Sequence, residues 1–219
     1  MKWFLDLTMR GKLFACFGLM IAFLAAVIAT SYLGIAEMQA SQKSLYQEDF
    51  ANAVDLMKLR VEQNGMRAAQ LTMMVLPSRS EQERWRQDAD GRSKEIETAM
   101  RRLIERGRSD PKLFARLEEL KAIHDAFEQT RAAQINPLIF EGKLEEAKEL
   151  ALGVNAERYL KMRSIAQELG NAAAEKARMS VAESELRAQQ AVRSFVAVGV
   201  AAVLLAVAMV LFLNRIIAV

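Results

Sequence analysis

Three polar side chains on one stripe of a predicted helix could bind a carboxylate. Arg60 and Arg67 stand two helical turns apart, and Asn64 lies between them. A guanidinium group binds a carboxylate through two parallel, charge-assisted hydrogen bonds. We expect Arg158, on the last predicted helix, to approach this stripe, with Tyr159 beside it. These five residues form the candidate ligand-binding site.

The same residues also have a structural interpretation, which the sequence favours. Charged side chains are common on solvated helix surfaces, and burying an unpaired charge is costly. Asn64 could then be a single polar residue in an apolar seam, where it would fix the register of a bundle or of a dimer.

The single histidine, His124, is the residue that a metal ion or a haem would use. A metal site needs further ligands, but there is no second histidine, and the only cysteine, Cys16, lies in an apolar block. We therefore expect His124 to be a partly buried structural residue that could pair with Glu128, one turn further on. Trp85 and Tyr159 could line a pocket, although aromatic residues at helical spacing more often belong to a core. The sequence predicts no metal and no cofactor.

Catalysis and nucleic-acid binding are not expected. The chain contains no Ser/His/Asp set, no phosphate-binding loop and no metal-binding motif. Of its 30 basic and 27 acidic residues, four basic ones and one acidic one lie outside residues 37–193, so this segment carries 26 of each. A nucleic-acid-binding protein needs a basic excess on one face.

Two long apolar blocks bound the segment that carries the candidate site. Residues 13–36 and 194–214 contain no charged side chain, and as helices both are long enough to cross the roughly 30 Å hydrocarbon core of a bilayer. The sequence therefore predicts two transmembrane helices. A cleaved signal peptide is the alternative for the first block. That block is, however, longer than the usual apolar region of a signal, and no clean small-x-small site ends it.

Basic residues beside the blocks predict the orientation of the chain. A basic leader, residues 1–12, precedes the first block, and Arg215 lies in a short stub, residues 215–219, after the second. Basic residues near membrane-spanning ends stay in the cytoplasm. We expect both termini in the cytoplasm of a bacterium, two spans in its inner membrane, and residues 37–193 in the periplasm.

Between the blocks, apolar residues recur with helical spacing, and no alternating β pattern is found. The first helix is predicted to end at Pro77. Ser80 with Glu83 fits a capping box that would start the second helix, and Asp110 with Pro111 fits the start of the third. The predicted core seam of the first helix consists of Phe50, Val54, Met57, Val61, Asn64, Ala68, Leu71 and Val75.

The remaining signals place a break, a short helix and a long final helix. Asn136-Pro137 is expected to interrupt the third helix, and Gly142 to cap its end. A short helix should cover residues 143–152, and the last helix should run from Val154 into the second block without a break. The seam predicted for this last helix consists of Met162, Ile165, Leu169, Ala172, Met179 and Leu186.

The helix lengths predict an all-α architecture. Residues 37–76 and 154–193 would form helices of forty residues each, about 60 Å long. Two helices fit between them, which gives an antiparallel up-down four-helix bundle. The bundle is flanked by two transmembrane helices that are continuous with its first and last helices.

The whole chain resembles the sensory half of a bacterial methyl-accepting chemotaxis receptor with a four-helix-bundle ligand-binding domain. The leader LTMRGKLFACFGLM, the segment FEGKLEEAKELALG before the last helix, and the exit FLNRIIAV resemble the corresponding parts of that family. In the family, the second span leads into a HAMP relay and a methylated coiled coil that docks a kinase. The present chain ends five residues after Asn214, so we expect either a fragment or a protein that works through a partner chain.

The resemblance implies a homodimeric sensor that detects a small molecule or a protein outside the cytoplasm. Relatives that bind aspartate or serine place three arginines on the first exported helix, two of them four residues apart. Arg60 and Arg67 are seven residues apart, which departs from that pattern. Two other hypotheses remain open, namely a membrane-anchored structural or interaction protein and the input half of a sensor histidine kinase or cyclase.

Overall fold

The computed structural model describes residues 8–217, and every element within that range is helical. The chain divides into two compact units, one of residues 45–179 and the other of residues 1–44 and 180–219. Residues 1–7 of the predicted leader and residues 218–219 of the predicted stub lie outside the described residues. The all-α prediction is confirmed for the part of the chain that the structure describes.

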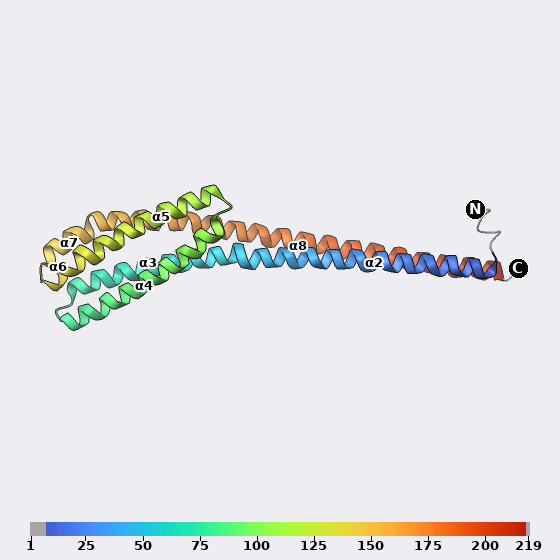
Figure 1. Cartoon of the computed structure of the whole chain (residues 1–219), viewed down its shortest axis with the longest axis horizontal. Helices are drawn as coiled ribbons and strands as arrows, with labels where there is room; N and C mark the ends of the chain where they lie inside the picture. The colour runs from blue at the N-terminus through green and yellow to red at the C-terminus, as the bar shows by residue number, and fades with distance from the viewer. Residues whose placement is uncertain (1–7, 218–219) are drawn as a thin grey trace. The chain divides into compact units, whose positions relative to one another are not determined.

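Residues 45–179 form an antiparallel four-helix bundle, as predicted (Figure 1). A π-helix, η1 (Leu45–Phe50), leads into α3 (Ala51–Val75), and α4 (Arg79–Gly107) returns beside it. The third segment consists of α5 (Pro111–Thr130), the π-helix η2 (Arg131–Ile135) and α6 (Asn136–Phe140). The short α7 (Leu144–Leu152) follows, and the first part of α8 (Val154–Ile217) is the fourth segment.

Two of the predicted helix caps are present. The Asp110 carboxylate accepts hydrogen bonds from the backbone N–H groups of Lys112 and Leu113, at 3.0 and 3.1 Å, and Pro111 begins α5. Gly142 follows α6 with φ +76°, a left-handed conformation that suits a residue without a Cβ. These caps fix where the third segment begins and ends.

The predicted capping box of Ser80 and Glu83 is wrong. Helix α4 begins at Arg79, so Ser80 lies inside the helix and Ser78 occupies the cap position. Leu76, whose conformation is restricted by the following Pro77, and Ser78 both have extended backbones, and α4 starts at the next residue. Glu83 instead accepts hydrogen bonds from Arg86, one turn along the same helix.

The predicted break at Asn136-Pro137 is also wrong, because the helix widens there instead of ending. The backbone N–H of Asn136 bonds to the carbonyl of Arg131, five residues back, within the π-helix η2. Pro137 has no N–H to offer to a residue four positions back, and the wider turn before it accommodates this loss. The third segment therefore continues to Phe140.

The core of the bundle consists of two hydrophobic clusters. The larger one includes Leu56, Leu59, Met66, Ile96, Leu103, Leu117, Leu120, Phe127, Tyr159, Met162 and Ile165. The smaller one, toward the α6–α7 end, includes Met73, Met74, Ile135, Ile139, Ala147 and Ala151. Buried Gln70 and Arg131 stand between members of the two clusters along α3 and along the third segment, and buried Asn155 stands between Ala151 of α7 and Tyr159 of α8. A polar layer thus divides the core.

The core seam predicted for the first helix is wrong except at Leu71, which packs against the smaller cluster. Val54, Met57 and Val61 are more than half exposed, whereas Leu56, Leu59 and Met66 are almost completely buried. Both sets recur at helical spacing, so α3 has two apolar faces, and the face with Leu59 packs inside the bundle. The seam predicted for the last helix is correct from Met162 to Leu169. Beyond Leu169, the predicted residues Ala172, Met179 and Leu186 are exposed. Ala173 and Ala177 face inward in their place.

Ion pairs join α3 to α4 beside the core. Arg102 and Arg106 of α4 each contact the carboxylate of Asp55, on α3, at 2.5 Å. Burial alone would raise the pKa of Asp55, but the hydrogen bonds and positive charges of the two arginines outweigh it and hold this pKa below its ordinary value. Asp55 is therefore ionised at neutral pH and fixes the pairing of the two helices.

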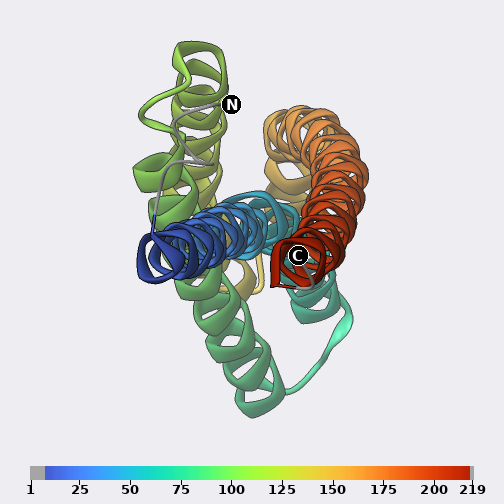
Figure 2. The same cartoon turned by 90° about the vertical axis from the view of Figure 1, so that its right-hand side faces the viewer.

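The second unit contains two helices long and apolar enough to cross a membrane. They are α2 (Met9–Ser44) and the C-terminal part of α8, which lie side by side (Figure 2). A Cβ atom built on Gly34 would lie 3.2 Å from Cζ of Phe195, so the glycine permits a close approach of the two helices.

The exposed and buried faces of α3 can be compared by a pair of alanine substitutions. Leu59→Ala removes a side chain that is fully buried, so the free energy of unfolding should fall by about 2–5 kcal/mol. Val61→Ala, on the exposed face, should change it by less than about 0.5 kcal/mol. Urea unfolding of the full chain would be followed in dilute detergent, with about one chain per micelle. If Val61→Ala lowered the free energy of unfolding more than Leu59→Ala, the seam predicted from the sequence would be the correct one.

Candidate functional site

The structure brings three of the five predicted site residues together. The hydroxyl group of Tyr159, on α8, donates a hydrogen bond to Oδ1 of Asn64, on α3, at 2.5 Å. The guanidinium carbon of Arg67 lies 4.2 Å from the centroid of the Tyr159 ring, which is a cation–π contact. Tyr159 is buried, whereas Asn64 is exposed and Arg67 half-buried. These three residues link α3 to α8 at the edge of the core.

The other two predicted residues are placed differently. Arg60 lies one turn before Asn64 on α3, and a Cβ on Gly170 of α8 would lie 3.9 Å from its Nη1 atom. It therefore belongs to the same α3–α8 seam. Arg158 turns to α5 instead and donates hydrogen bonds to the carbonyl of Ala126 and to the hydroxyl group of Thr130, at 3.1 and 2.6 Å. Its expected approach to the α3 stripe is wrong, because these acceptors hold it on the other side of α8.

Arg60 and Arg67 differ from the arginines of α4 in their electrostatic surroundings. Arg92 and Arg102 of α4 each bind a carboxylate directly. Arg60 and Arg67 have no ion-pair partner among residues 8–217, and both are half-buried. The α3–α8 seam thus presents two guanidinium groups whose charge is not neutralised by a neighbouring side chain. An anionic group could bind there without displacing an existing salt bridge.

The exposed apolar residues of α3 run alongside this cluster. We call them the outer stripe: Val54, Met57, Val61, Ala68 and Val75, interrupted by Asn64. Tyr46 and Phe50 extend the stripe through η1, with their rings stacked 5.8 Å apart. Asn64 is therefore a polar residue in an apolar seam, as its structural interpretation states, but this seam faces outward.

His124 is more buried than expected, and Trp85 less. Only 1% of His124 is exposed, and neither ring nitrogen has a hydrogen-bond partner among the described residues. Its expected pairing with Glu128 is wrong, because Glu128 binds the buried guanidinium of Arg131. No group of three potential metal ligands is found among residues 8–217. Trp85 is exposed and does not belong to the core.

The buried ion-pair cluster around Arg131 was not predicted from the sequence. Arg131, in η2, is almost completely buried and contacts Asp90 of α4 and Glu128 of α5 at 2.7 and 2.8 Å. The spacing of Glu128 and Arg131 on one helix face is a visible signal of an ion pair. Nothing in the sequence shows that the pair is buried or that Asp90 joins it.

Comparisons with known proteins give one match. A family model described as a four helix bundle sensory module for signal transduction matches residues 6–188. No curated protein and no solved structure matches the chain. The match covers the whole bundle, including the α3–α8 seam, and the first of the two candidate spans.

The buried imidazole of His124 should make the stability of the bundle depend on pH. Burial lowers the pKa of His124 below its ordinary value near 6.5, against the opposing charges of Glu128, Asp125 and Glu97. The unfolded chain therefore binds this proton more readily than the folded one, and stability is lost as the pH falls below about 6.5. Between pH 7.5 and 5, the unfolding midpoint of the full chain should fall further in the wild type than in His124→Gln. An equal fall in both proteins would contradict this assignment.

Proposed function

The chain belongs to the family of four-helix-bundle sensory modules for signal transduction, and on this premise we propose that it is the input half of a bacterial methyl-accepting chemotaxis receptor. In this role the bundle detects a small molecule or a protein outside the cytoplasm, and the two spans anchor it in the inner membrane with both termini in the cytoplasm. Its action is a change of helix position, without catalysis.

The observation that carries the proposal is the continuity of α8. One helix runs from Val154, in the bundle, to Ile217, beyond the second apolar block. Packed helices can slide by an ångström or two between discrete arrangements, and an unbroken helix passes such a displacement along its whole length. A ligand drives the change only if it binds one arrangement more tightly than the other. The α3–α8 seam is the place where such a difference in binding would move α8.

The outer stripe supports a homodimer. A contiguous apolar patch on a protein surface marks an interaction site, and from Val54 to Ala68 this stripe follows the alternating three- and four-residue spacing of a helix–helix interface. A second copy of α3 would cover it, with Asn64 fixing the register. Arg60 and Arg67 flank the stripe, so two copies would bring their guanidinium groups toward a shared anionic ligand.

Disulfide cross-linking tests the dimer directly. In a Cys16→Ser background, Val61→Cys places a thiol on the outer stripe, and Lys94→Cys places one on the exposed surface of α4. Oxidation of the full chain in membranes should convert most of the Val61→Cys protein to a covalent dimer and little of the Lys94→Cys protein. Equal cross-linking at the two positions, or none at Val61→Cys, would count against an α3 interface.

A hybrid receptor tests the sensory role. Residues 1–219 would be joined to the HAMP and kinase-controlling half of a chemoreceptor whose output is measurable, and a panel of amino acids, organic acids and aromatic compounds would be applied. We expect at least one compound to change kinase activity, and Arg60→Ala or Arg67→Ala to weaken that response at least tenfold. Arg163→Ala, an exposed α8 residue, is the matched control.

The result separates the proposal from its rival. If the hybrid controls the kinase but responds to no compound, the result would indicate that the bundle detects a protein partner instead of a small molecule. A folded hybrid whose output is fixed under every condition would instead favour a membrane-anchored interaction protein.

A further inference from the structure

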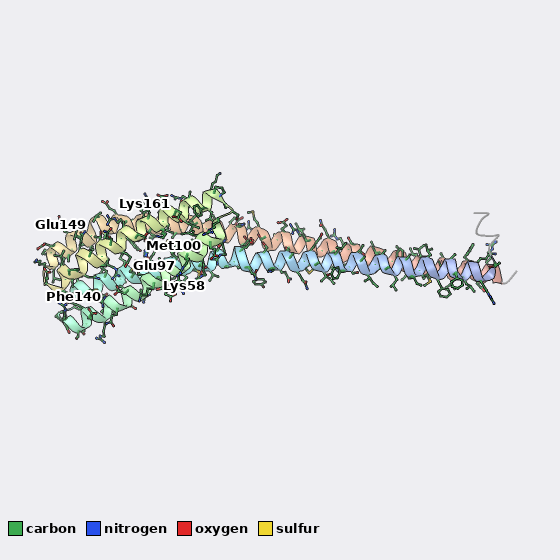
Figure 3. The ribbon with its side chains drawn as sticks, viewed as in Figure 1. Lys58, Glu97, Met100, Phe140, Glu149 and Lys161 are labelled. Atoms are coloured by element: carbon green, nitrogen blue, oxygen red, sulfur yellow. The ribbon has the colours of Figure 1, made fainter. Side chains whose placement is uncertain are left out.

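A groove lies between α4 and α5, and none of its lining residues belongs to the α3–α8 seam. Its volume is about 750 Å³, within the range of small-molecule sites, and both helices line it. Met100, which is buried, and Ile104 supply its apolar part from α4, and His124 lines it from α5. Figure 3 shows Met100 and Glu97 one turn apart on α4. The flexible thioether side chain of Met100 allows this apolar part to adapt to an occupant.

His124 gives this groove an unfilled hydrogen-bonding requirement. The residue is more than nine-tenths buried, and both Nδ1 and Nε2 are without a hydrogen-bond partner among the described residues. Buried polar groups in folded proteins are almost always hydrogen-bonded, so such a group requires an explanation. Burial lowers the pKa of His124, and the neutral ring therefore offers one donor and one acceptor.

The charges around the imidazole favour a cation. Of the charged residues that line the groove, Lys121 is already bound to Asp125 at 2.6 Å. Glu97 lies near His124 and has no ion-pair partner among residues 8–217. Arg101 follows Glu97 by one turn on α4, and Arg108 and Glu105 lie further along the same helix, while Glu118 lies on α5. None of these four residues has an ion-pair partner among residues 8–217. The carboxylates exceed the guanidinium groups, and the free carboxylate next to the imidazole is Glu97.

We propose that the groove between α4 and α5 binds a small organic cation, with its ammonium group held by Glu97 and hydrogen-bonded to His124, and with its apolar body on Met100 and Ile104. The proposal names a chemical class of input and rests on the proposed sensory function for its biological meaning. Binding itself can be measured without any output, so a failure here is distinguishable from a failure of the hybrid receptor.

His124 makes the experiment selective, since it is the only histidine in the chain. The full chain would be labelled with ¹⁵N-histidine, placed in lipid nanodiscs and titrated with phenethylamine. We expect a saturable shift of the ring-nitrogen resonances, Nδ1 and Nε2, of this one imidazole. The isosteric 2-phenylethanol, which lacks the charge, and the anion phenylacetate should bind at least tenfold more weakly.

Two variants locate the ammonium group. Glu97→Gln keeps the shape of an exposed side chain and removes its charge, so phenethylamine affinity should fall at least tenfold. Glu149→Gln, on the exposed surface of α7, is the matched control and should leave affinity unchanged (Figure 3). The proposal is overturned by any of three results: no saturable shift, equal binding of the alcohol or the anion, or an equal loss of affinity in both variants.

Discussion

An unbroken backbone is the constraint on which this protein depends. Every amide of α8 from Val154 to Ile217 that is not at an end bonds within the helix, and inside a bilayer no other partner is present. The chain contains three prolines, and none lies in α2 or α8. Pro77 separates α3 from α4, Pro111 begins α5, and Pro137 follows the π-helix η2. All three prolines therefore lie within residues 45–179, and the wide turn of η1, between α2 and α3, contains none.

The two faces of α3 explain why the bundle can be both stable and open to a partner. Leu59 and its neighbours complete the core, while the outer stripe remains on the surface with Asn64, Arg60 and Arg67 nearby. A helix with one apolar face would leave these polar residues on a fully solvated surface. Under the proposed function, a ligand or a second chain that covered the stripe would also contact the α3–α8 seam, and α3 would then couple recognition to helix position.

The sequence predicted the helices better than it predicted their orientation. The fold class, the Asp110 cap, the Gly142 cap and the long last helix all follow from local chemistry that few neighbours can change. Helix α3 has two apolar faces, and the one that packs into the core is the one that fits the neighbouring helices better. Periodicity alone does not show which face this is. Asn64, Arg67 and Tyr159 are three of the predicted site residues and lie in contact. Arg158 and Glu128 instead bind partners that only the assembled bundle provides.

The polar layer of Gln70, Arg131 and Asn155 also affects how the bundle unfolds. This layer separates the two hydrophobic clusters. Opening the α6–α7 end would therefore disrupt only the smaller cluster and leave the packing around Leu59 and Phe127 intact. On this ground we expect the α6–α7 end of the bundle to open before the rest. The backbone amides of α6 and α7 should exchange their hydrogens with solvent through a local opening, well before the chain unfolds globally.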